Sequence, residues 1–302
     1  QNGGETQQPT ATGTEQPRSK RGGASGTAGG VSSGNVVEDP TVEHGDYRAD
    51  DGSLRTPKEK NTPKNTRNYL YPEDAGEIDN MSPMERLETN VEALEVLRTL
   101  LTEERDATPE ERATLGKLRG WGGINVPDNY TAKFTPLAMN PLQKRLVAVV
   151  NALDPNEERK LLDSLRTASL TSYYTPIPIA RAMHAIAEQA GYKGNGNMLD
   201  PSMGNGVFEG SMAKGVQQST NIRGVELDWL TGQIAQKLYP DARINITGFQ
   251  DAHIPQDYYD YVVSNIPFGS LQITDLDWQK KPSPIRKAAQ GKIHNYFAVK
   301  MI

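Results

Sequence analysis

The chain has 302 residues, a formal net charge of −5 and no cysteine, which excludes disulfides, thiolate zinc sites and cysteine nucleophiles. Its hydrophobic fraction of 35% and mean hydropathy of −0.65 are low for a chain that folds along its whole length, so we expect part of it to be disordered. The negative charge excludes a uniformly basic nucleic-acid-binding protein, so any contact with nucleic acid must come from a local patch.

Residues 1–78 are rich in Gly, Ser, Thr, Pro, Gln and charged residues. The stretch Gly22–Gly26, with the sequence GGASG, is typical of flexible linkers. Apolar residues are too sparse here to offset the entropy lost on ordering. We therefore predict a disordered linker over residues 1–78, and the alternative is a segment that folds on a partner.

Residues 79–168 are predicted to form a helical module. Three capping boxes, each with proline at the first helical position, begin at Ser82, Thr108 and Asp154. Apolar residues follow the first box at helical spacing. The second helix is expected to end near Gly120 and the third near Thr167.

The sequence Lys117–Gly123, KLRGWGG, stands out inside this module. One interpretation is the end of a helix, followed by a glycine turn with a packed Trp121. The other is a loop that touches DNA or the cofactor-binding domain. The residues alone leave both interpretations open.

Residues 169–302 alternate between strand and helix patterns, which predicts an α/β fold. A helix is expected over 176–190, because Ile179, Met183, Ile186 and Ala187 fall on one face. Further helices are expected over 207–216 and 230–239 and from 293 onward. Strands are predicted at 197–200, 222–226, 244–247 and 258–264.

A glycine turn follows the first predicted strand, with the sequence Leu199–Phe208, LDPSMGNGVF. Glycine allows a tight turn and the close approach of a ligand, as at Gly204 and Gly206. The next glycine, Gly210, lies one residue too far for a dinucleotide fingerprint. An ordinary glycine-rich turn is the alternative.

One acidic residue ends the second predicted strand, and another follows the third. Glu226 lies about 20 residues after the glycine turn, where a carboxylate can accept both ribose hydroxyls of a nucleoside. Asp251 can accept from an adenine amino group, and Phe249 can pack on the adenine ring. A capped turn is the alternative at Asp251.

The most informative sequence is Asn265–Gly269, NIPFG, directly after the apolar strand. The lone pair of an aromatic amine is delocalised into its ring, so the amine is a poor nucleophile. The Asn265 side-chain oxygen and the Ile266 backbone oxygen can accept its hydrogens and draw the nitrogen towards tetrahedral geometry. Pro267 rigidifies the turn, and Phe268 can stack on an extruded base.

Upstream, Tyr173–Pro176, with the sequence YYTP, precedes the first helix of the α/β part. Thr175 lies near the helix N-terminus, where the dipole and free N–H groups favour a carboxylate. Helix capping by Thr175 is compatible with this.

The order of these motifs resembles that of gamma-class N6-adenine DNA methyltransferases, from YTP through the glycine turn to NxPF. The resemblance covers about residues 171–300 and departs from the family at Ile266, where the family has proline. It implies a Rossmann-like methyltransferase fold, S-adenosyl-L-methionine as cofactor and DNA as partner. It implies catalytic roles for Asn265, Ile266, Pro267 and Phe268. It implies cofactor binding by Tyr174, Thr175, Asp200, Pro201, Gly204, Gly206, Phe208, Glu226 and Asp251.

Together with Lys117–Gly123 and the sequence His294–Phe297, HNYF, these motifs look like the methylase portion of large methylase–helicase proteins of conjugative elements and phages. Some of those proteins have antirestriction roles. The resemblance implies that the rest of the same polypeptide, with a possible helicase, is a partner. A stretch between Ser270 and Lys292 can hold DNA phosphates or be a solvated loop. Its cations include Lys280, Lys281, Arg286 and Lys287.

Only four strands are visible where such sheets carry about seven, and the chain begins at Gln1 and ends inside a predicted helix. We therefore expect a fragment that binds the cofactor poorly alone. The four histidines are scattered, and no apolar run approaches bilayer length, so we predict no metal, no membrane and a cytoplasmic location. The rival functions are methylation of RNA or of a protein glutamine, and a degenerate domain that binds DNA or a partner.

Overall fold

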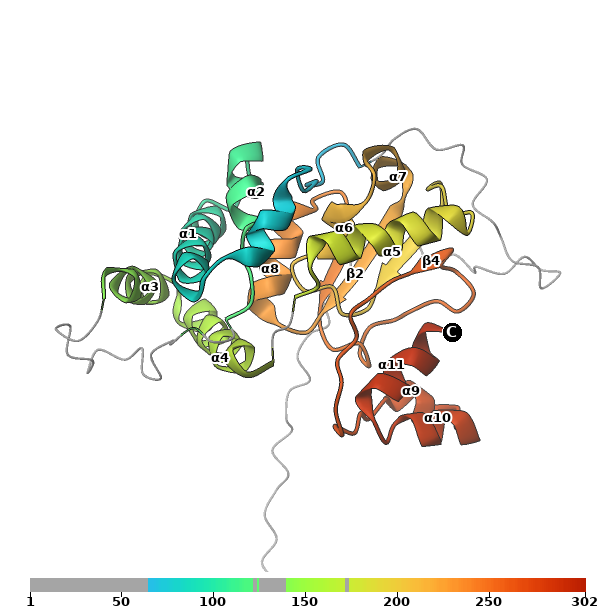
Figure 1. The fold of residues 1–302 in the computed structure, drawn as a ribbon. Coiled ribbons are helices and arrows are strands. Elements are labelled where there is room, and N and C mark those ends of the chain that lie inside the picture. Colours follow the sequence, from blue (N-terminus) through green and yellow to red (C-terminus); the bar gives the residue numbers. More distant parts are fainter. Residues whose placement is uncertain (1–64, 122–123, 125–139, 172–173) are drawn as a thin grey trace, which may run out of the picture. The chain divides into compact units, whose positions relative to one another are not determined.

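The computed structural model describes residues 65–121, 124, 140–171 and 174–302, apart from the side chains of 168–171. All of these belong to one compact unit, drawn in Figure 1. Residues 65–78 pack into it: Asn65, Tyr71 and Ala75 are 3–6% exposed. The predicted linker boundary at 78 is therefore wrong for residues 65–78, and residues 1–64 lie outside the described part.

The described sheet is parallel throughout, and its strand order is β3-β2-β1-β4. The strands are β1 (Asn197–Asp200), β2 (Asn221–Glu226), β3 (Arg243–Ile246) and β4 (Tyr261–Val262). The order reverses at β1, because β2 pairs on one side of it and β4 on the other. In open parallel sheets this switch point, at the carboxyl ends of the strands, is where ligands bind. The α/β class and the Rossmann-like arrangement are confirmed.

The helix α5 (Ile177–Gln189) precedes β1, the short helices α6 (Val207–Ser211) and α7 (Lys214–Ser219) link β1 to β2, and α8 (Trp229–Leu238) links β2 to β3. The single helix expected over 207–216 is thus two short ones. The helix expected over 176–190 exists, but the face that predicted it is exposed. Ile179 and Ile186 are 53% and 66% exposed, whereas α5 buries Ile177, Ala180 and His184.

The helical segment contains a 3-10 helix, η1 (Ala75–Asn80), followed by α1 (Pro83–Thr102), α2 (Pro109–Leu115), α3 (Pro141–Asn151) and α4 (Pro155–Thr171). The predicted helix starts are confirmed, because the Ser82 and Thr108 boxes form both of their hydrogen bonds and Asp154 accepts from two backbone N–H groups. The predicted end of α2 near Gly120 is wrong. The helix stops at Leu115, and the chain turns before Arg119.

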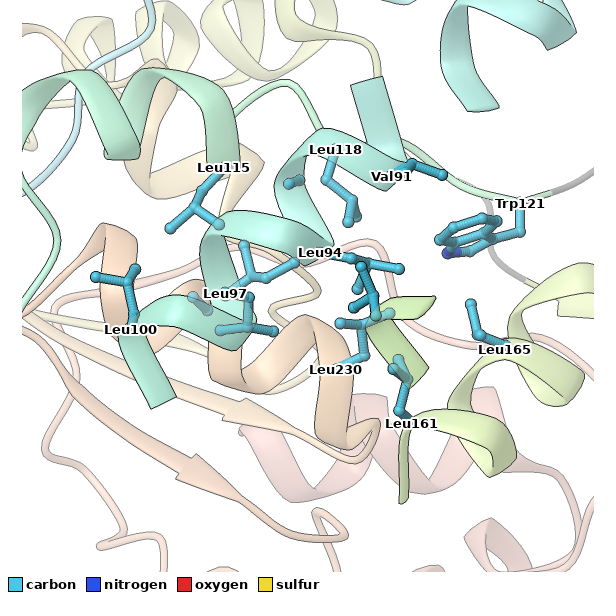
Figure 2. Close-up of a cluster of buried hydrophobic side chains, with 14 of the residues drawn as sticks. Val91, Leu94, Leu97, Leu100, Leu115, Leu118, Trp121, Leu161, Leu165 and Leu230 are labelled. Carbon is cyan, nitrogen blue, oxygen red and sulfur yellow. The ribbon is translucent and has the colours of Figure 1, made fainter. Parts of the chain in front are cut away.

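One hydrophobic core joins these helices to the α/β part (Figure 2). Leu94 and Leu97 of α1 share it with Leu161 of α4 and Leu230 of α8, and each is at most 2% exposed. Trp121 is also buried there, at 1% exposed. The helical segment therefore packs directly on the helix that links β2 to β3.

The chain ends in three helices, α9 (Leu276–Lys280), α10 (Pro284–Ala289) and α11 (Ile293–Met301). Their aromatic residues Trp278, Tyr296 and Phe297 form a separate cluster with Phe249, which follows β3. Lys300 crosses this junction, because its Nζ donates to the carbonyls of Phe249 and Gln250. The segment after Asn265 is thereby fixed to the turn after β3.

Candidate functional site

The glycine turn and the Asn265 loop lie at the same edge of the sheet. Val263 N–H donates to Leu199 O at 3.1 Å, which continues the pairing of β4 with β1. One residue later, the Ser264 hydroxyl donates to Asp200 Oδ1 at 2.7 Å. Asn265 follows directly and is exposed. The chain thus enters the Asn265 loop beside the carboxylate that begins the glycine turn.

The glycine turn, residues 200–206, uses two left-handed positions. Gly204 has φ +58°, and a Cβ there would meet nothing within 4 Å. Gly206 has φ +81°, and a Cβ there would collide with the ring of Tyr239. The Tyr239 hydroxyl also donates to Gly206 O. One glycine therefore leaves open space beside the backbone, and the other is pressed against α8.

Glu226 is bound to the glycine turn. Its Oε2 accepts from Gly204 N–H at 2.6 Å, and its Oε1 accepts from Asp228 N–H at 2.7 Å. Burial raises the pKa of Glu226 to about 7, although both hydrogen bonds act to lower it. The carboxylate at the end of β2 is thus held in place beside Gly204.

Asp200, at the end of β1, is completely buried. Its Oδ1 accepts from Ser264 and, at 3.0 Å, from Ser202 N–H. Its Oδ2 is buried and makes no hydrogen bond to the described residues. Burial raises the pKa of Asp200, and the nearby Glu226 charge adds to the rise. Pro201, next in the chain, is also buried.

Tyr174 and Thr175 lie before α5, whereas residues 172–173 of the same motif are outside the described part. Burial raises the pKa of the Tyr174 hydroxyl, and the charges of Asp228 and Glu226 raise it further. The Tyr174 ring packs against two hydrophobic clusters, one of which includes Met203 of the glycine turn. The start of α5 already binds a carboxylate from within the chain. Ile177 N–H donates to Asp79 Oδ2 at 2.7 Å.

Three further residues were predicted to contact the cofactor, and their surroundings differ: two are buried among other aromatic rings and one is exposed. Phe208 is 4% exposed and packs in the core with its ring edge-on to His184. Phe249 is 3% exposed and stacks with Phe297, so its ring is already covered. Asp251 is exposed and accepts from Gln250 Nε2 at 2.8 Å.

The Asn265 loop presents one large exposed ring. Ile266 is half-buried and packs against the C-terminal aromatic cluster, and Pro267 is also half-buried. Phe268 is 78% exposed. Its ring centroid lies 6.1 Å from that of His294, at the start of α11. The aromatic side chain is accessible at the end of the loop.

The predicted DNA-contacting cations lie on α9 and α10 and between them. Lys281 and Lys287 are exposed. Lys280 forms an exposed ion pair with Asp277 at 3.1 Å. Arg286 instead lies over the Trp278 ring, 5.6 Å from its centroid, and donates to Lys281 O at 2.8 Å. Arg286 thus also has an internal role.

The sequence analysis did not identify three residues whose hydrogen bonds hold the glycine turn, the Asn265 loop and the start of α5 in place. These residues are Asp79, Ser264 and Asn205. Asp79 and Asn205 bind partners far away in the chain, so no local pattern marks them. Ser264 was treated only as part of the strand before Asn265, although its position at a strand end beside β1 is a signal that was available.

Within the described residues, no three or more His, Asp or Glu side chains gather to hold a metal ion. In the same part of the chain, no helix has both the length and the apolar character needed to cross a bilayer.

No protein-family model matches this chain. Over 137 residues it is 34% identical to Defense against restriction protein B of Escherichia phage P1. The matched region is 44% of this chain and 6% of the phage protein. The chain therefore matches only a small part of that curated protein.

The similar solved structures include a modification subunit of a putative type I restriction enzyme from Vibrio vulnificus YJ016, with 19% identity, a TM-score of 0.34 and coverage of 53% of this chain and 39% of that one. A type I restriction-modification system methyltransferase subunit from Streptococcus thermophilus has 20% identity, a TM-score of 0.34 and coverage of 53% and 38%. A putative class I S-adenosylmethionine-dependent methyltransferase from Listeria monocytogenes has 17% identity, a TM-score of 0.36 and coverage of 72% and 69%. Similarities of this size do not extend to the chemistry of the site.

Proposed function

We propose that this chain is part of an S-adenosylmethionine-dependent methyltransferase that acts on the N6 amino group of adenine in DNA. The observation that carries the proposal is the bond between Ser264 and Asp200. It joins the start of the Asn265 loop to the start of the glycine turn, so that an amine acceptor and a nucleoside-binding turn share one edge of the sheet.

The residues of this edge suit a nucleoside cofactor with an amino-acid tail. Gly204 leaves space for close approach, and Glu226 presents a fixed carboxylate to ribose hydroxyls. The unpartnered Asp200 Oδ2 is a buried acceptor at the same place. Tyr174 packs against two hydrophobic clusters and Thr175 follows it before α5, while Asp251 is exposed after β3 to accept from an adenine amine. Pro201, Gly206 and Phe208 shape the turn from within. The cofactor supplies an electrophilic methyl group on a sulfonium.

The Asn265 loop prepares the nucleophile. The Asn265 Oδ1 and the Ile266 backbone oxygen accept the two hydrogens of the adenine amine, which localises its lone pair on nitrogen. A nitrogen–carbon bond forms as the carbon–sulfur bond breaks, and the sulfur retains the electron pair. The methylated nitrogen then releases a proton to solvent. Since the second acceptor is a backbone carbonyl, isoleucine at position 266 preserves its role.

Phe268 and the C-terminal cations bind the substrate. The exposed ring of Phe268 offers a stacking surface for an extruded base, and Pro267 restricts the loop that carries it. Lys280, Lys281, Arg286 and Lys287 lie on the segment that follows this loop and contact phosphates. The name of the phage P1 protein motivates a wider hypothesis, that a protein containing this chain protects DNA against restriction. A helicase in the same polypeptide is proposed from the sequence resemblance alone.

The test is transfer of a labelled methyl group by the full-length polypeptide to DNA, RNA and protein. We expect label in N6-methyladenine of DNA. Asn265→Ala is expected to abolish transfer, and Asn151→Ala, which alters an exposed asparagine at the end of α3, is the matched control. Label in RNA or in a glutamine side chain would replace the proposed substrate. Cofactor binding without any transfer would identify a binding module instead.

A further inference from the structure

The Arg119 segment, residues 118–121, contacts the glycine turn and is buried there. Arg119 is 4% exposed, although it carries a charge, and Leu118 is completely buried. Asn205, between the two glycines of the turn, is also completely buried. Figure 2 shows Leu118 and Trp121 turned into the shared core. Polar groups this deep require partners, and those partners belong to the two walls of the proposed site.

The first wall is the glycine turn itself. Asn205 Nδ2 donates to Leu118 O at 2.9 Å, across 87 residues of sequence. The buried Asn205 side chain therefore fastens the turn to the Arg119 segment. Gly206 is held separately, by Tyr239, which directly follows α8.

The second wall is the start of α5, which follows Tyr174 and Thr175. Arg119 Nε donates to Asp79 Oδ1 at 3.1 Å, and Asp79 Oδ2 accepts from Ile177 N–H at 2.7 Å. Asp79 thus bridges the guanidinium and the first backbone N–H of α5. The ion pair is shielded from water, since the two side chains are 4% and 16% exposed.

Arg119 itself is fixed by the helical segment. Asn90 of α1 accepts from Arg119 N–H at 2.9 Å and donates to Arg119 O at 2.8 Å. Arg119 Nη1 donates to the carbonyls of Gly116 and Leu118. Leu118 O therefore accepts from both Arg119 and Asn205, and joins the two connections at one atom.

We propose that Arg119 and Asn205 are positioning residues, through which the helical segment sets the geometry of the glycine turn and of the α5 start. The ligand-binding part of this proposal rests on the proposed function, because it takes S-adenosylmethionine as the occupant between these walls. The Arg119 segment then belongs to the cofactor site without touching the cofactor.

Amide hydrogen exchange tests the positioning without any ligand. In Arg119→Lys the planar fork that reaches Asp79 and two carbonyls is lost but the charge is kept. In Asn205→Asp the donor to Leu118 O is lost. We expect exchange at Ile177 to rise about tenfold in Arg119→Lys, and exchange at Gly204 and Gly206 to rise about tenfold in Asn205→Asp. Asp79→Asn, a milder change, is expected to affect Ile177 alone.

Arg145→Lys is the matched control, because Arg145 makes an equally direct ion pair with Glu95 between α3 and α1, away from both walls. We expect it to leave exchange at Ile177, Gly204 and Gly206 unchanged. A uniform rise over the whole fold in all the variants, or no rise at the two walls, would overturn the proposal.

Calorimetry with S-adenosylhomocysteine and the full-length polypeptide completes the test. We expect Arg119→Lys and Asn205→Asp to weaken binding about tenfold and Arg145→Lys to leave it unchanged. If the unaltered protein does not bind this ligand while exchange changes as expected, the proposed function fails and the positioning stands. If it binds and all variants bind equally well, the positioning role at the site fails alone.

Discussion

The buried carboxylate of Glu226 makes stability depend on pH. Its pKa is about 7 in the folded protein, above the ordinary 4.5, so the folded state holds more protons than the unfolded state between these values. Its stabilising contribution is therefore complete below about pH 4.5 and is lost as the pH rises towards 7. We expect this group to lower the free energy of unfolding by roughly 1–3 kcal/mol across that window.

Urea unfolding of the wild type and of Glu226→Gln between pH 4.5 and 7.5 checks this prediction. The variant should lose less stability with rising pH than the wild type. Glu111→Gln serves as a control, because Arg105 lowers the pKa of Glu111 to about 2 and its removal has no flattening effect in this range. Parallel pH profiles for the wild type and Glu226→Gln would contradict the account.

The two glycines of the turn should respond differently to alanine. Gly206→Ala combines a left-handed φ with a collision against Tyr239, so we expect a loss of roughly 2–4 kcal/mol of unfolding free energy. Gly204→Ala places its methyl group in open space and should cost about 1 kcal/mol. Thermal unfolding of both variants measures the difference, and equal losses would be inconsistent with the described turn.

Site residues could be predicted from the sequence where a residue with suitable chemistry also lies in a recognisable turn at the end of a strand. The glycine turn and Asn265 are such cases, because strand ends, glycine and proline mark them. Phe249 was predicted to pack on a ligand but lies in an aromatic cluster with α11, which is far away in sequence. Asp79 was not recognised, since its partners Arg119 and Ile177 are brought to it only by folding.

The bounds of the helices could be predicted where they depend on neighbouring residues, and could not where they depend on residues far away in the chain. Helix starts at Pro83, Pro109 and Pro155 follow from capping boxes, whose hydrogen bonds join residues two or three apart. The end of α2 does not follow from sequence, because Asn90 of α1 binds the backbone of Arg119 and holds it outside the helix. Periodicity located α5 but not its buried face.

The face of α5 has a measurable consequence. Ile186 is 66% exposed and Ile177 is completely buried, although both are isoleucines of one helix. Ile186→Lys should change the free energy of unfolding by less than about 0.5 kcal/mol, whereas Ile177→Ala should cost about 2–4 kcal/mol. Comparable losses in thermal unfolding for the two variants would show that α5 buries its other face.

At the scale of the whole molecule, a chain with net charge −5 requires a local surface to bind DNA. We propose that the exposed Lys281 and Lys287 belong to such a surface. Substituting either by glutamate should weaken DNA binding and reduce the slope of log affinity against log salt by about 1. The exposed Lys214 of α7 provides the control substitution. An unchanged slope for Lys281→Glu and Lys287→Glu would exclude this surface.

In the proposed reaction, the Asn265 loop activates an amine beside a cofactor bound at the glycine turn. The most direct measurement compares kcat and the cofactor dissociation constant of the full-length polypeptide with those of Asn265→Ala. We predict that kcat falls by at least about a hundredfold while cofactor binding is unchanged, because a preorganised acceptor is removed. Unchanged turnover in Asn265→Ala would show that Asn265 does not activate the amine.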